Sequence, residues 1–376
     1  MDRTVGFLGL GGDGTRVFGL DPVTRANRFA RKAKLAPIDR VPADGACGGL
    51  IVADLGFAWD PAWLPYLAAR PGLAVTLGGR PALVHVPDAA DAPAIVAAIT
   101  AGGPLPHGPR LTEQRAETDA SLYNTTLRKR EDAYLLPLTA ETATRVEKAS
   151  YDASYKGVTD VLTLYLWRGA AFHLTRWAAA ARMTPNMVTM IGIALCIASF
   201  FLFLHGHFAT GLALGLIFMV LDTVDGKLAR CTGTSSEWGN ILDHGVDLVH
   251  PPFWYWAWGI GLGAWGLAFT TPTLWKIMEV LIAGYIVQRA IEGAFIARFG
   301  MHIHVWQRTD SRFRLITARR NPNVVLLFAS LLIARPDWGL LWVAWWTALS
   351  CLFHLVRLAQ AWRARARGQE IVSWLA

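Results

Sequence analysis

Residues 221–247 read LDTVDGKLARCTGTSSEWGNILDHGVD, a segment with four aspartates at the end of a long apolar run. Asp222 and Asp225 are three residues apart, so they share one face of a helix. Asp243 and Asp247 are four apart and share a face in the same way. If two such helices pack together, the carboxylates converge and repel one another unless a cation neutralises them. Oxygen ligands in this number suit one or two Mg²⁺ or Mn²⁺ ions, which can hold a diphosphate.

Small residues and one arginine lie between the aspartates. Gly226 and Gly239 would let a bulky ligand or a neighbouring helix come close, and Ala229 would face the same space. Arg230 offers planar donors to phosphate oxygens. The alternative is that the small residues only pack helices and the aspartates only cap them. The complete spacing favours a binding site.

The composition around this segment is that of a membrane protein. Of 376 residues, 53% are hydrophobic and 17% are charged, whereas a soluble domain carries about 25% charged residues. This composition excludes a disordered chain, a fibrous chain and a purely soluble enzyme. A span needs about 20 apolar residues, and six stretches are candidates: 187–204, 208–221, 247–269, 274–295, 324–334 and 338–358. The second and fifth are short unless the second continues through 222–230 and the fifth begins at Pro322.

Lysine and arginine are distributed unevenly among the connections between these spans. They cluster before the first span and after the second, fourth and sixth, and the alternate connections hold few. Because positive charge favours the cytoplasmic side, we expect an even number of spans and both termini in the cytoplasm. We interpret the net charge of +8 as a topology and lipid-headgroup signal rather than a nucleic-acid signal. The predicted fold is an α-helical protein of the cell (inner) membrane with six transmembrane helices and an N-terminal cytoplasmic α/β domain.

The predicted domains are 1–112, 113–182 and 183–376. Residues 1–112 alternate short apolar runs with helical patterns, which predicts an α/β domain. We expect strands at 5–10, 49–55, 74–77 and 82–86, and helices at 60–69 and 91–101. Residues 113–182 are interpreted as a connecting arm and a juxtamembrane amphipathic helix, and 183–376 as the membrane domain. No signal peptide is expected, and the four cysteines have no metal-like spacing.

Other polar residues of the membrane half support more than one interpretation. Gln288, Arg289 and Glu292, near the end of the fourth span, contact an acceptor or form an i, i+3 ion pair with an extended arginine. The stretch SRFRLITARRNPN (311–323) binds phosphate or anionic lipid, or is an ordinary topology signal. Four histidines show no metal-ligand spacing: His244, His250, His302 and His304.

The spacing D-x2-D-G-x2-A-R-x8-G-x3-D-x3-D resembles the CDP-alcohol phosphotransferase (CDP-alcohol phosphatidyltransferase) family, and every fixed position matches over 222–247. Residues 184–189 (TPNMVT) also resemble the segment that opens the first span of that family, and the resemblance covers roughly 156–376. It implies a six-helix enzyme of phospholipid biosynthesis that moves a substituted phosphate from a CDP-alcohol to an acceptor alcohol and releases CMP.

The same resemblance implies roles for individual residues. The metal ligands would be Asp222, Asp225, Asp243 and Asp247. Asp247 would also be the general base that acts on the acceptor hydroxyl. The CDP pocket would be formed by Pro185, Asn186, Gly226, Ala229, Arg230, Ser236 and Gly239.

The turn LGGDGTRV (10–17) resembles the G-x-G-T-R turn that opens nucleotidyltransferase domains, with Asp54 as the matching metal aspartate. The domain is short for that fold, and no Pro-Lys pair follows the turn at the expected distance, although Lys32 and Lys34 are nearby. We therefore interpret it as a degenerate, noncatalytic relative. One alternative is an active cytidylyltransferase, which would make the chain a bifunctional enzyme that produces an inositol-type phosphodiester. The other alternative is an unrelated α/β fold.

The predicted partners are a CDP-alcohol donor (CDP-diacylglycerol or a CDP-polyol), a small or lipid alcohol acceptor, membrane lipids and a second copy in a homodimer, without nucleic acid. An ion-binding transport protein also places aspartates in the membrane, and a scaffold with a relict motif is a third class. The glycine, alanine and arginine positions argue against transport because a pore needs no nucleotide pocket. The intact aspartate spacing argues against decay. The sequence does not identify the acceptor.

Overall fold

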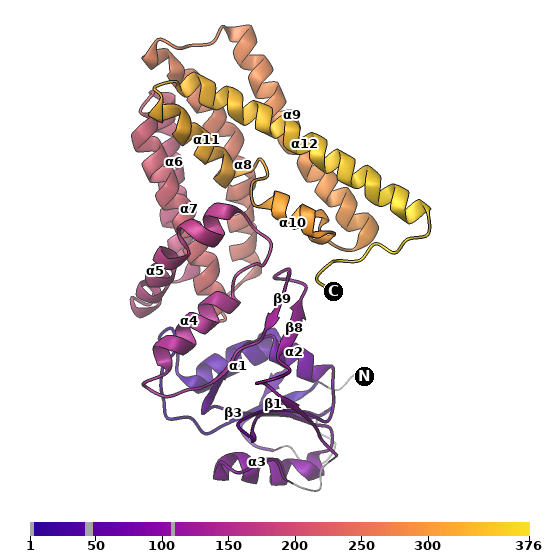
Figure 1. The fold of residues 1–376 in the computed structure, drawn as a ribbon. Helices are drawn as coiled ribbons and strands as arrows, with labels where there is room; N and C mark the ends of the chain where they lie inside the picture. Colours follow the sequence, from indigo (N-terminus) through magenta and orange to yellow (C-terminus); the bar gives the residue numbers. More distant parts are fainter. Residues whose placement is uncertain (1–3, 42–47, 107–109) are drawn as a thin grey trace. The chain divides into compact units, whose positions relative to one another are not determined.

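The structure, a computed structural model, describes residues 4–41, 48–106 and 110–376. It describes no side chains for Ala89, Asn240, Asp243 and His244. The chain divides into two compact units (Figure 1). The first comprises Met1–Tyr155, Arg176–Arg182 and Lys227–Thr234, and the second comprises Lys156–Thr175, Met183–Gly226 and Ser235–Ala376.

A six-stranded mixed sheet forms the centre of the first unit. Its order is β2 (Ala36–Pro37), β1 (Gly6–Leu10), β3 (Leu50–Asp54), β6 (Arg80–Val86), β5 (Leu73–Leu77) and β7 (Thr112–Arg115). Strand β1 runs parallel to β2 and β3, whereas β6 is antiparallel to both of its neighbours. All five residues of β3 are buried, and the first four are apolar, as suits a strand covered on both faces.

Helices cover this sheet and create an apolar layer on each face. Helix α1 (Pro22–Lys32) starts at Asp21, whose carboxylate accepts a hydrogen bond from the Thr24 amide. Its Phe29 packs in a core with Phe7 and Trp59. Helix α3 (Ala92–Ala101) covers a second core that includes Val52 and Ile95. The remaining helical elements of this unit are η1 (Ala89–Asp91), α2 (Trp63–Ala68) and α4 (Ala143–Ala153).

The α/β fold continues past residue 112. Strand β7 pairs in parallel with β5, and β10 (Leu135–Pro137) pairs with β4 (Phe57–Trp59). Strands β8 (Ser121–Asn124) and β9 (Lys129–Asp132) form a hairpin. The four expected strands and two expected helices are present, and α1 was not predicted. Thus the segment interpreted as a connecting arm also contributes strands to this fold.

The second unit is helical. Its elements, with α5 and α7 extending beyond it, are η2 (Leu162–Leu166), α5 (Arg168–Ala180), α6 (Pro185–Leu204), α7 (Phe208–Cys231), α8 (Glu237–Gly261), η3 (Leu262–Trp265), α9 (Thr271–Phe299), η4 (Ile303–Val305), α10 (Arg308–Arg314), α11 (Arg320–Leu332) and α12 (Pro336–Ala366). Within the described residues, four helices are long and apolar enough to cross a membrane: α6, α7, α9 and α12. The two longest helices of this unit are α9 and α12 (Figure 1).

The other two predicted spans correspond to shorter or interrupted helices. The third corresponds to α8, which contains Pro251 and Pro252 and ends at Gly261 rather than at 269. The fifth corresponds to α11, which has 13 residues and begins at Arg320, before Pro322. The second span does continue through the polar segment, because α7 ends only at Cys231. Four of the six expected spans therefore meet the length and hydropathy criteria.

Close packing of α6, α7 and α8 positions the aspartates. A Cβ at Gly261 would lie 1.9 Å from the Phe203 carbonyl oxygen, so only glycine allows this approach of α8 to α6. The Trp254 ring lies 5.3 Å from that of Phe203, and its indole N–H donates to the Cys196 carbonyl at 3.1 Å. Among the described cysteines, Cys196, Cys231 and Cys351 are free thiols; Cys47 lies outside the described residues.

Candidate functional site

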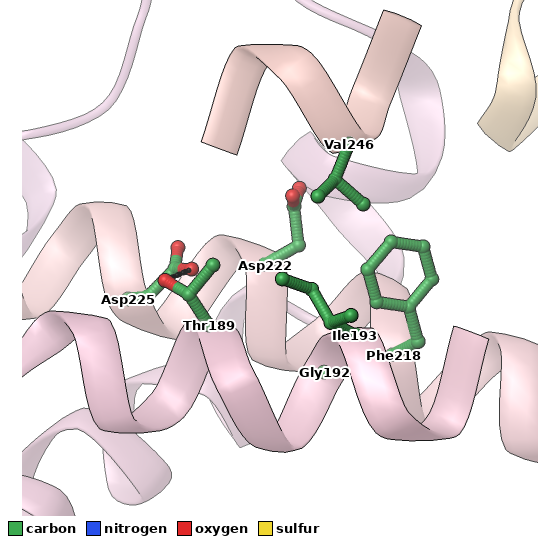
Figure 2. A pocket seen from close by; sticks show the side chains of 7 residues that line it. All are labelled: Thr189, Gly192, Ile193, Phe218, Asp222, Asp225 and Val246. Carbon is green, nitrogen blue, oxygen red and sulfur yellow. Dashed lines mark hydrogen bonds between the residues drawn. The ribbon is translucent and has the colours of Figure 1, made fainter. Parts of the chain in front are cut away.

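Two aspartates of α7 border one region: Asp225 faces α6, and Asp222 points toward Val246 of α8 (Figure 2). The Asp225 carboxylate is buried, and its Oδ2 accepts a hydrogen bond from the Thr189 hydroxyl at 2.5 Å (Figure 2). Its Oδ1 accepts from the Gly226 amide at 2.5 Å. Asp222 lies one turn earlier on α7, as the i, i+3 spacing predicts. The two carboxylates therefore reach one region from a single helix, with Thr189 fixing the deeper one.

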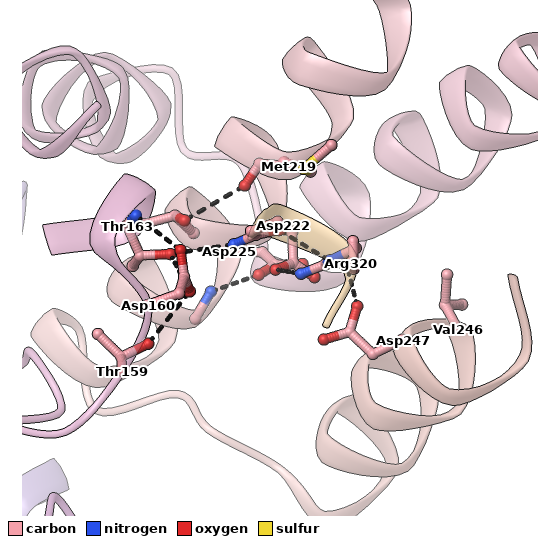
Figure 3. Close-up of polar contacts among 12 residues, drawn as sticks. Thr159, Asp160, Thr163, Met219, Asp222, Asp225, Val246, Asp247 and Arg320 are labelled. Carbon is pink, nitrogen blue, oxygen red and sulfur yellow. Dashed lines mark hydrogen bonds and ion pairs between the residues drawn. The ribbon is translucent and has the colours of Figure 1, made fainter. Parts of the chain in front are cut away.

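An arginine connects the α7 and α8 carboxylates. Arg320, the first residue of α11, donates from Nη2 to Asp222 Oδ2 at 2.6 Å and from Nη1 to Asp247 Oδ1 (Figure 3). Asp247 belongs to α8. The structure thus brings Asp222, Asp225 and Asp247 into one polar cluster, as the helix-packing model of the sequence expected.

Asp243 cannot be placed in the same way. Its backbone lies on α8 one turn before Asp247, but its side chain, like that of His244, lies outside the described residues. Among the side chains that are described, no three His, Cys, Asp or Glu residues form a group that could hold a metal ion. The donor chemistry of the cluster nevertheless fits one, because carboxylate oxygens are the ligands that Mg²⁺ and Mn²⁺ prefer. The Arg320 guanidinium pairs with the carboxylates of Asp222 and Asp247, which shows that the cluster attracts positive charge.

A small cavity borders the α7 aspartates. It is lined by Thr189, Gly192, Ile193, Phe218, Asp222, Asp225 and Val246 (Figure 2). Its volume is about 10 Å³, which is room for roughly one water molecule. The space between α6, α7 and α8 is therefore of the size of an ion or a water molecule rather than a nucleotide.

A hydrogen-bonded chain continues from Arg320 to the segment before α5. Arg320 Nε donates to Asn321 Oδ1 at 3.1 Å, and the Asn321 amide donates to the Thr163 hydroxyl at 3.2 Å. Thr163 in turn donates to Asp160 from its hydroxyl at 2.8 Å and from its amide at 3.0 Å (Figure 3). The Arg320 guanidinium is therefore held from two sides, by carboxylates and by this chain.

Sequence reasoning missed Arg320 and Thr189 as site residues. Arg320 lies in the arginine-rich stretch 311–323, whose charge was interpreted as topology or as binding to phosphate or lipid. Its position directly before Asn321-Pro322, at a helix start, was the available signal. Thr189 lies in the 184–189 segment, where Pro185 and Asn186 were selected instead. The sequence of the arginine-rich stretch does not show that Arg320 contacts aspartates of other helices. The sequence of the 184–189 segment likewise does not show that Thr189 contacts Asp225.

The residues expected around CDP lie near three helix ends. Pro185 is the first residue of α6. The Ser236 hydroxyl caps α8 by accepting from the Gly239 amide at 3.0 Å, and a Cβ at Gly239 would lie 3.1 Å from Asn186 Oδ1. Gly239 therefore lets the start of α8 lie against the start of α6. The others, Gly226, Ala229 and Arg230, follow the aspartates along the last two turns of α7.

The polar residues of the fourth predicted span form an ion cluster. Glu292 accepts from Arg289 at 2.9 Å and from Arg319, and its Oε1 lies 3.1 Å from His304 Nε2. Burial lowers the pKa of His304 well below its ordinary value, so the imidazole is neutral. The i, i+3 ion pair expected between Arg289 and Glu292 is confirmed. Gln288 is buried on the same helix.

The glycine-rich turn of the first unit lies beside Asp54. Gly11, Gly12 and Gly14 have φ values of 71°, 93° and 81°, which favour glycine. A Cβ at Gly11 would lie 3.7 Å from Asp54 Oδ1. The Asp54 carboxylate accepts from the Gly56 amide at 2.8 Å and lies 3.4 Å from Arg80 Nη2. Burial raises the pKa of Asp54.

Comparisons with known proteins identify the helical part of the chain. Residues 182–353 match the family model for CDP-alcohol phosphatidyltransferase. The chain is 31% identical to cholinephosphotransferase 1 of Xenopus laevis over 124 residues, which are 30% of each protein. It is 28% identical over 187 residues to archaetidylinositol phosphate synthase of Pyrococcus horikoshii, covering 49% of this chain and 86% of that protein. A crystal structure of phosphatidylinositol phosphate synthase from Mycobacterium tuberculosis, with CDP-DAG bound, aligns with a TM-score of 0.38 and 20% identity over 50% of this chain and 92% of that one.

The residues that match the family model include those of the site described above. The chain spans only 30% of the length of the Xenopus cholinephosphotransferase. The family model nonetheless starts at Arg182, directly before α6, and ends within α12, so it contains the whole aspartate pattern and Arg320. Residues 182–353 therefore form a domain of the CDP-alcohol phosphatidyltransferase family.

Proposed function

We propose that this protein is a metal-dependent membrane CDP-alcohol phosphotransferase of phospholipid biosynthesis. The observation that carries the proposal is the meeting of Asp222 and Asp225 from α7 with Asp247 from α8 in one polar cluster. Their spacing follows the family pattern, and the family model covers all three. An ion-binding transport protein is the less favoured alternative because the matched family is one of transferases.

The proposed cofactor is Mg²⁺ or Mn²⁺, as two ions. The residues that would hold them are Asp222, Asp225, Asp243 and Asp247. When bound, such ions neutralise the diphosphate of the donor and stabilise the charge that develops on the leaving CMP oxygen. The donor chemistry and the ion-sized cavity beside α7 support this assignment.

In the proposed reaction the acceptor hydroxyl attacks the phosphorus that carries the alcohol of the CDP-alcohol. The new bond joins the acceptor oxygen to this phosphorus, and the phosphoanhydride bond to CMP breaks. The hydroxyl proton passes to Asp247 and then to water, and CMP leaves with the electron pair of the broken bond. The Asp247 side chain is 40% exposed, so an acceptor can approach it. Because a carboxylate is a weak base for a hydroxyl, its main contribution is to orient the nucleophile.

We further propose that CDP binds along the last turns of α7 and the first turns of α6 and α8. Gly226 and Arg230 are four residues apart on α7, so they share a helix face. Ala229 belongs to the same small-residue pattern, and Arg230 provides donors for phosphate. On the other two helices we assign Pro185, Asn186, Ser236 and Gly239. The Ser236 hydroxyl accepts a hydrogen bond from the Gly239 amide at the start of α8, which supports a tight turn there.

The membrane arrangement that we propose has six spans, α8 and α11 included, with both termini in the cytoplasm and the cell (inner) membrane as location. The four long apolar helices and the basic connections support it. We also propose a homodimer, which chemical cross-linking in membranes would test. The domain comprising 1–112 is proposed as a degenerate nucleotidyltransferase relative, because it is short for that fold and no Pro-Lys pair follows its glycine-rich turn at the expected distance.

The test uses the full chain purified into lipid nanodiscs. CDP-diacylglycerol would be offered with glycerol phosphate, inositol phosphate, inositol or serine, and CDP-choline with diacylglycerol. The expected result is CMP release, dependent on Mg²⁺ or Mn²⁺, with one donor and acceptor pair. Absence of CMP release with every pair, in protein that is folded and binds CDP, would contradict the proposal.

A further inference from the structure

We infer that Arg320 is the internal counter-ion of the aspartate cluster: it holds Asp222 and Asp247 together without metal and competes with the divalent ion for them. The inference rests on the metal-dependent function proposed above and deepens it. It concerns which positive charge, the Arg320 guanidinium or the divalent ion, pairs with these carboxylates in the metal-free and metal-bound protein. The metal-free and metal-bound proteins would then differ in the partner of one guanidinium group.

The contacts show that the guanidinium is fixed in the cluster. Its two terminal nitrogens donate to carboxylates on different helices, α7 and α8, and its Nε donates to Asn321. The side chain is only 12% exposed. Its central carbon lies 5.2 Å from the centroid of the Phe218 ring, a cation–π distance. Every side of the group is thus engaged, which is unlike a surface arginine that pairs transiently.

The oxygens that Arg320 uses are those that a metal needs. Asp222 Oδ2 and Asp247 Oδ1 each accept a charge-assisted hydrogen bond from it. A carboxylate has a second oxygen, but an ion bound there would lie close to the charge of a guanidinium that is only 12% exposed. Metal binding to Asp222 and Asp247 therefore requires the guanidinium to move or the two cations to repel. In both cases Arg320 lowers the affinity for the ion.

The opposite role, in which Arg320 assists metal binding, is also physically reasonable. It predicts the opposite change in metal affinity when Arg320 is removed. If Arg320 only pre-organises Asp222 and Asp247 in the geometry that the ion requires, its removal weakens metal binding. Removal of a competing cation instead strengthens metal binding and makes the metal-free protein less stable. The sign of the change in metal affinity therefore separates the two roles.

The experiment measures Mn²⁺ and Mg²⁺ affinity of the full chain in nanodiscs, stripped with EDTA and without nucleotide. Mn²⁺ binding is followed by electron paramagnetic resonance, and Mg²⁺ binding by calorimetry. The variants are Arg320→Gln, Arg320→Lys and, as the matched control, Arg319→Gln. The control removes the same charge from the adjacent position, but Arg319 pairs with Glu292 rather than with the aspartates.

We expect Arg320→Gln to bind the ion about tenfold more tightly, since one guanidinium and its two carboxylate bonds no longer oppose it. Arg320→Lys should fall between that variant and the wild type, because lysine is a single point charge. Arg319→Gln should match the wild type. If Arg320→Gln is poorly folded without metal, its melting temperature should rise more on metal addition than that of the wild type.

Three outcomes would overturn the inference. Weaker binding in Arg320→Gln would show that Arg320 assists the ion. Equal affinity in all four proteins would show that it does not compete, although the metal site itself would stand. Failure of the wild type and all variants to bind either ion would refute the metal site of the proposed function and the inference with it. The second and third outcomes therefore distinguish failure of the inference from failure of the function.

Discussion

Arg319 and Arg320 are adjacent in the chain but donate to carboxylates on different helices. Arg319 pairs with Glu292 of α9, whereas Arg320 pairs with Asp222 of α7 and Asp247 of α8. Arg319 is the N-cap of α11 and has extended backbone, and Arg320 is its first residue. This change of direction sends two neighbouring side chains to two separate acidic groups. The ion cluster around Glu292 and the candidate site thus meet at the start of α11.

The first prediction concerns Glu292, the carboxylate of the structural cluster. Glu292→Gln should destabilise the helical unit by about 3 kcal/mol, because it leaves two half-buried cations without their buried anion. The Glu292 side chain is only 11% exposed and accepts from Arg289 and Arg319. The melting temperature in nanodiscs measures the effect. Glu279→Gln, at an exposed position of the same helix, is the control. Equal melting temperatures for both variants would show that the cluster contributes little.

The second prediction concerns the metal. Asp222→Asn should lower CMP release by about 100-fold or more, because it removes a charged ligand from a shared site. EDTA should abolish wild-type activity, and Mg²⁺ or Mn²⁺ should restore it. Glu237→Gln, an exposed acidic position in the first turn of α8, controls for loss of negative charge. Full wild-type activity in EDTA would refute the metal mechanism.

The third prediction concerns the base. Asp247→Asn keeps the shape of the side chain and should reduce the rate by about 10²–10⁴-fold, the range that general-base catalysis contributes. Its binding of CDP should change much less than its turnover, because the pocket residues remain. CMP release and equilibrium CDP binding measure the two quantities. Turnover close to that of the wild type would remove Asp247 from the mechanism.

Part of this site could be predicted from the sequence because it depends on local spacing. The distances between the aspartates along the chain place Asp222 and Asp225 on one face of α7, and the structure has them there. Their convergence with Asp247 also requires the two aspartate-bearing helices to pack together, which was a condition of the prediction from sequence. Asp247 accordingly lies in the same cluster as Asp222.

The contacts that could not be predicted join segments distant in the chain. Arg320 lies 98 residues from Asp222, and no periodicity relates the two. Thr189 meets Asp225 across 36 residues in the same way. In the first unit, the domain boundary predicted from sequence lies at residue 112 and is followed by a connecting arm. Strand β7 begins at Thr112, and its pairing with β5 depends on a partner that is distant in the chain.

The fourth prediction concerns Thr189. Thr189→Val keeps the volume but removes the hydroxyl that donates to Asp225 at 2.5 Å. Because Asp225 is buried, loss of this donor leaves its carboxylate less well oriented and less stabilised. We expect metal affinity and CMP release to fall by about tenfold, which corresponds to about 1.4 kcal/mol. Thr189→Ser retains the donor and should restore both. Equal behaviour of the two variants would assign the role of Thr189 to packing.

The last prediction concerns the glycine-rich turn of the first unit. Arg16→Ala and Asp54→Asn, each made in the full chain, should leave CMP release within about twofold of wild type, because neither residue belongs to the aspartate cluster. Point variants are preferable to a truncation at residue 112, because that cut would remove β7 and β10 from the sheets that contain β5 and β4. The Asp54 carboxylate already accepts from the Gly56 amide and pairs with Arg80, and an asparagine oxygen can accept the same amide. The wild-type chain should also release no pyrophosphate from CTP and a polyol phosphate. If pyrophosphate is released, and both variants abolish it, the domain is an active cytidylyltransferase and the chain is bifunctional. The polyol phosphate that supports the release would then identify the alcohol carried by the CDP-alcohol donor.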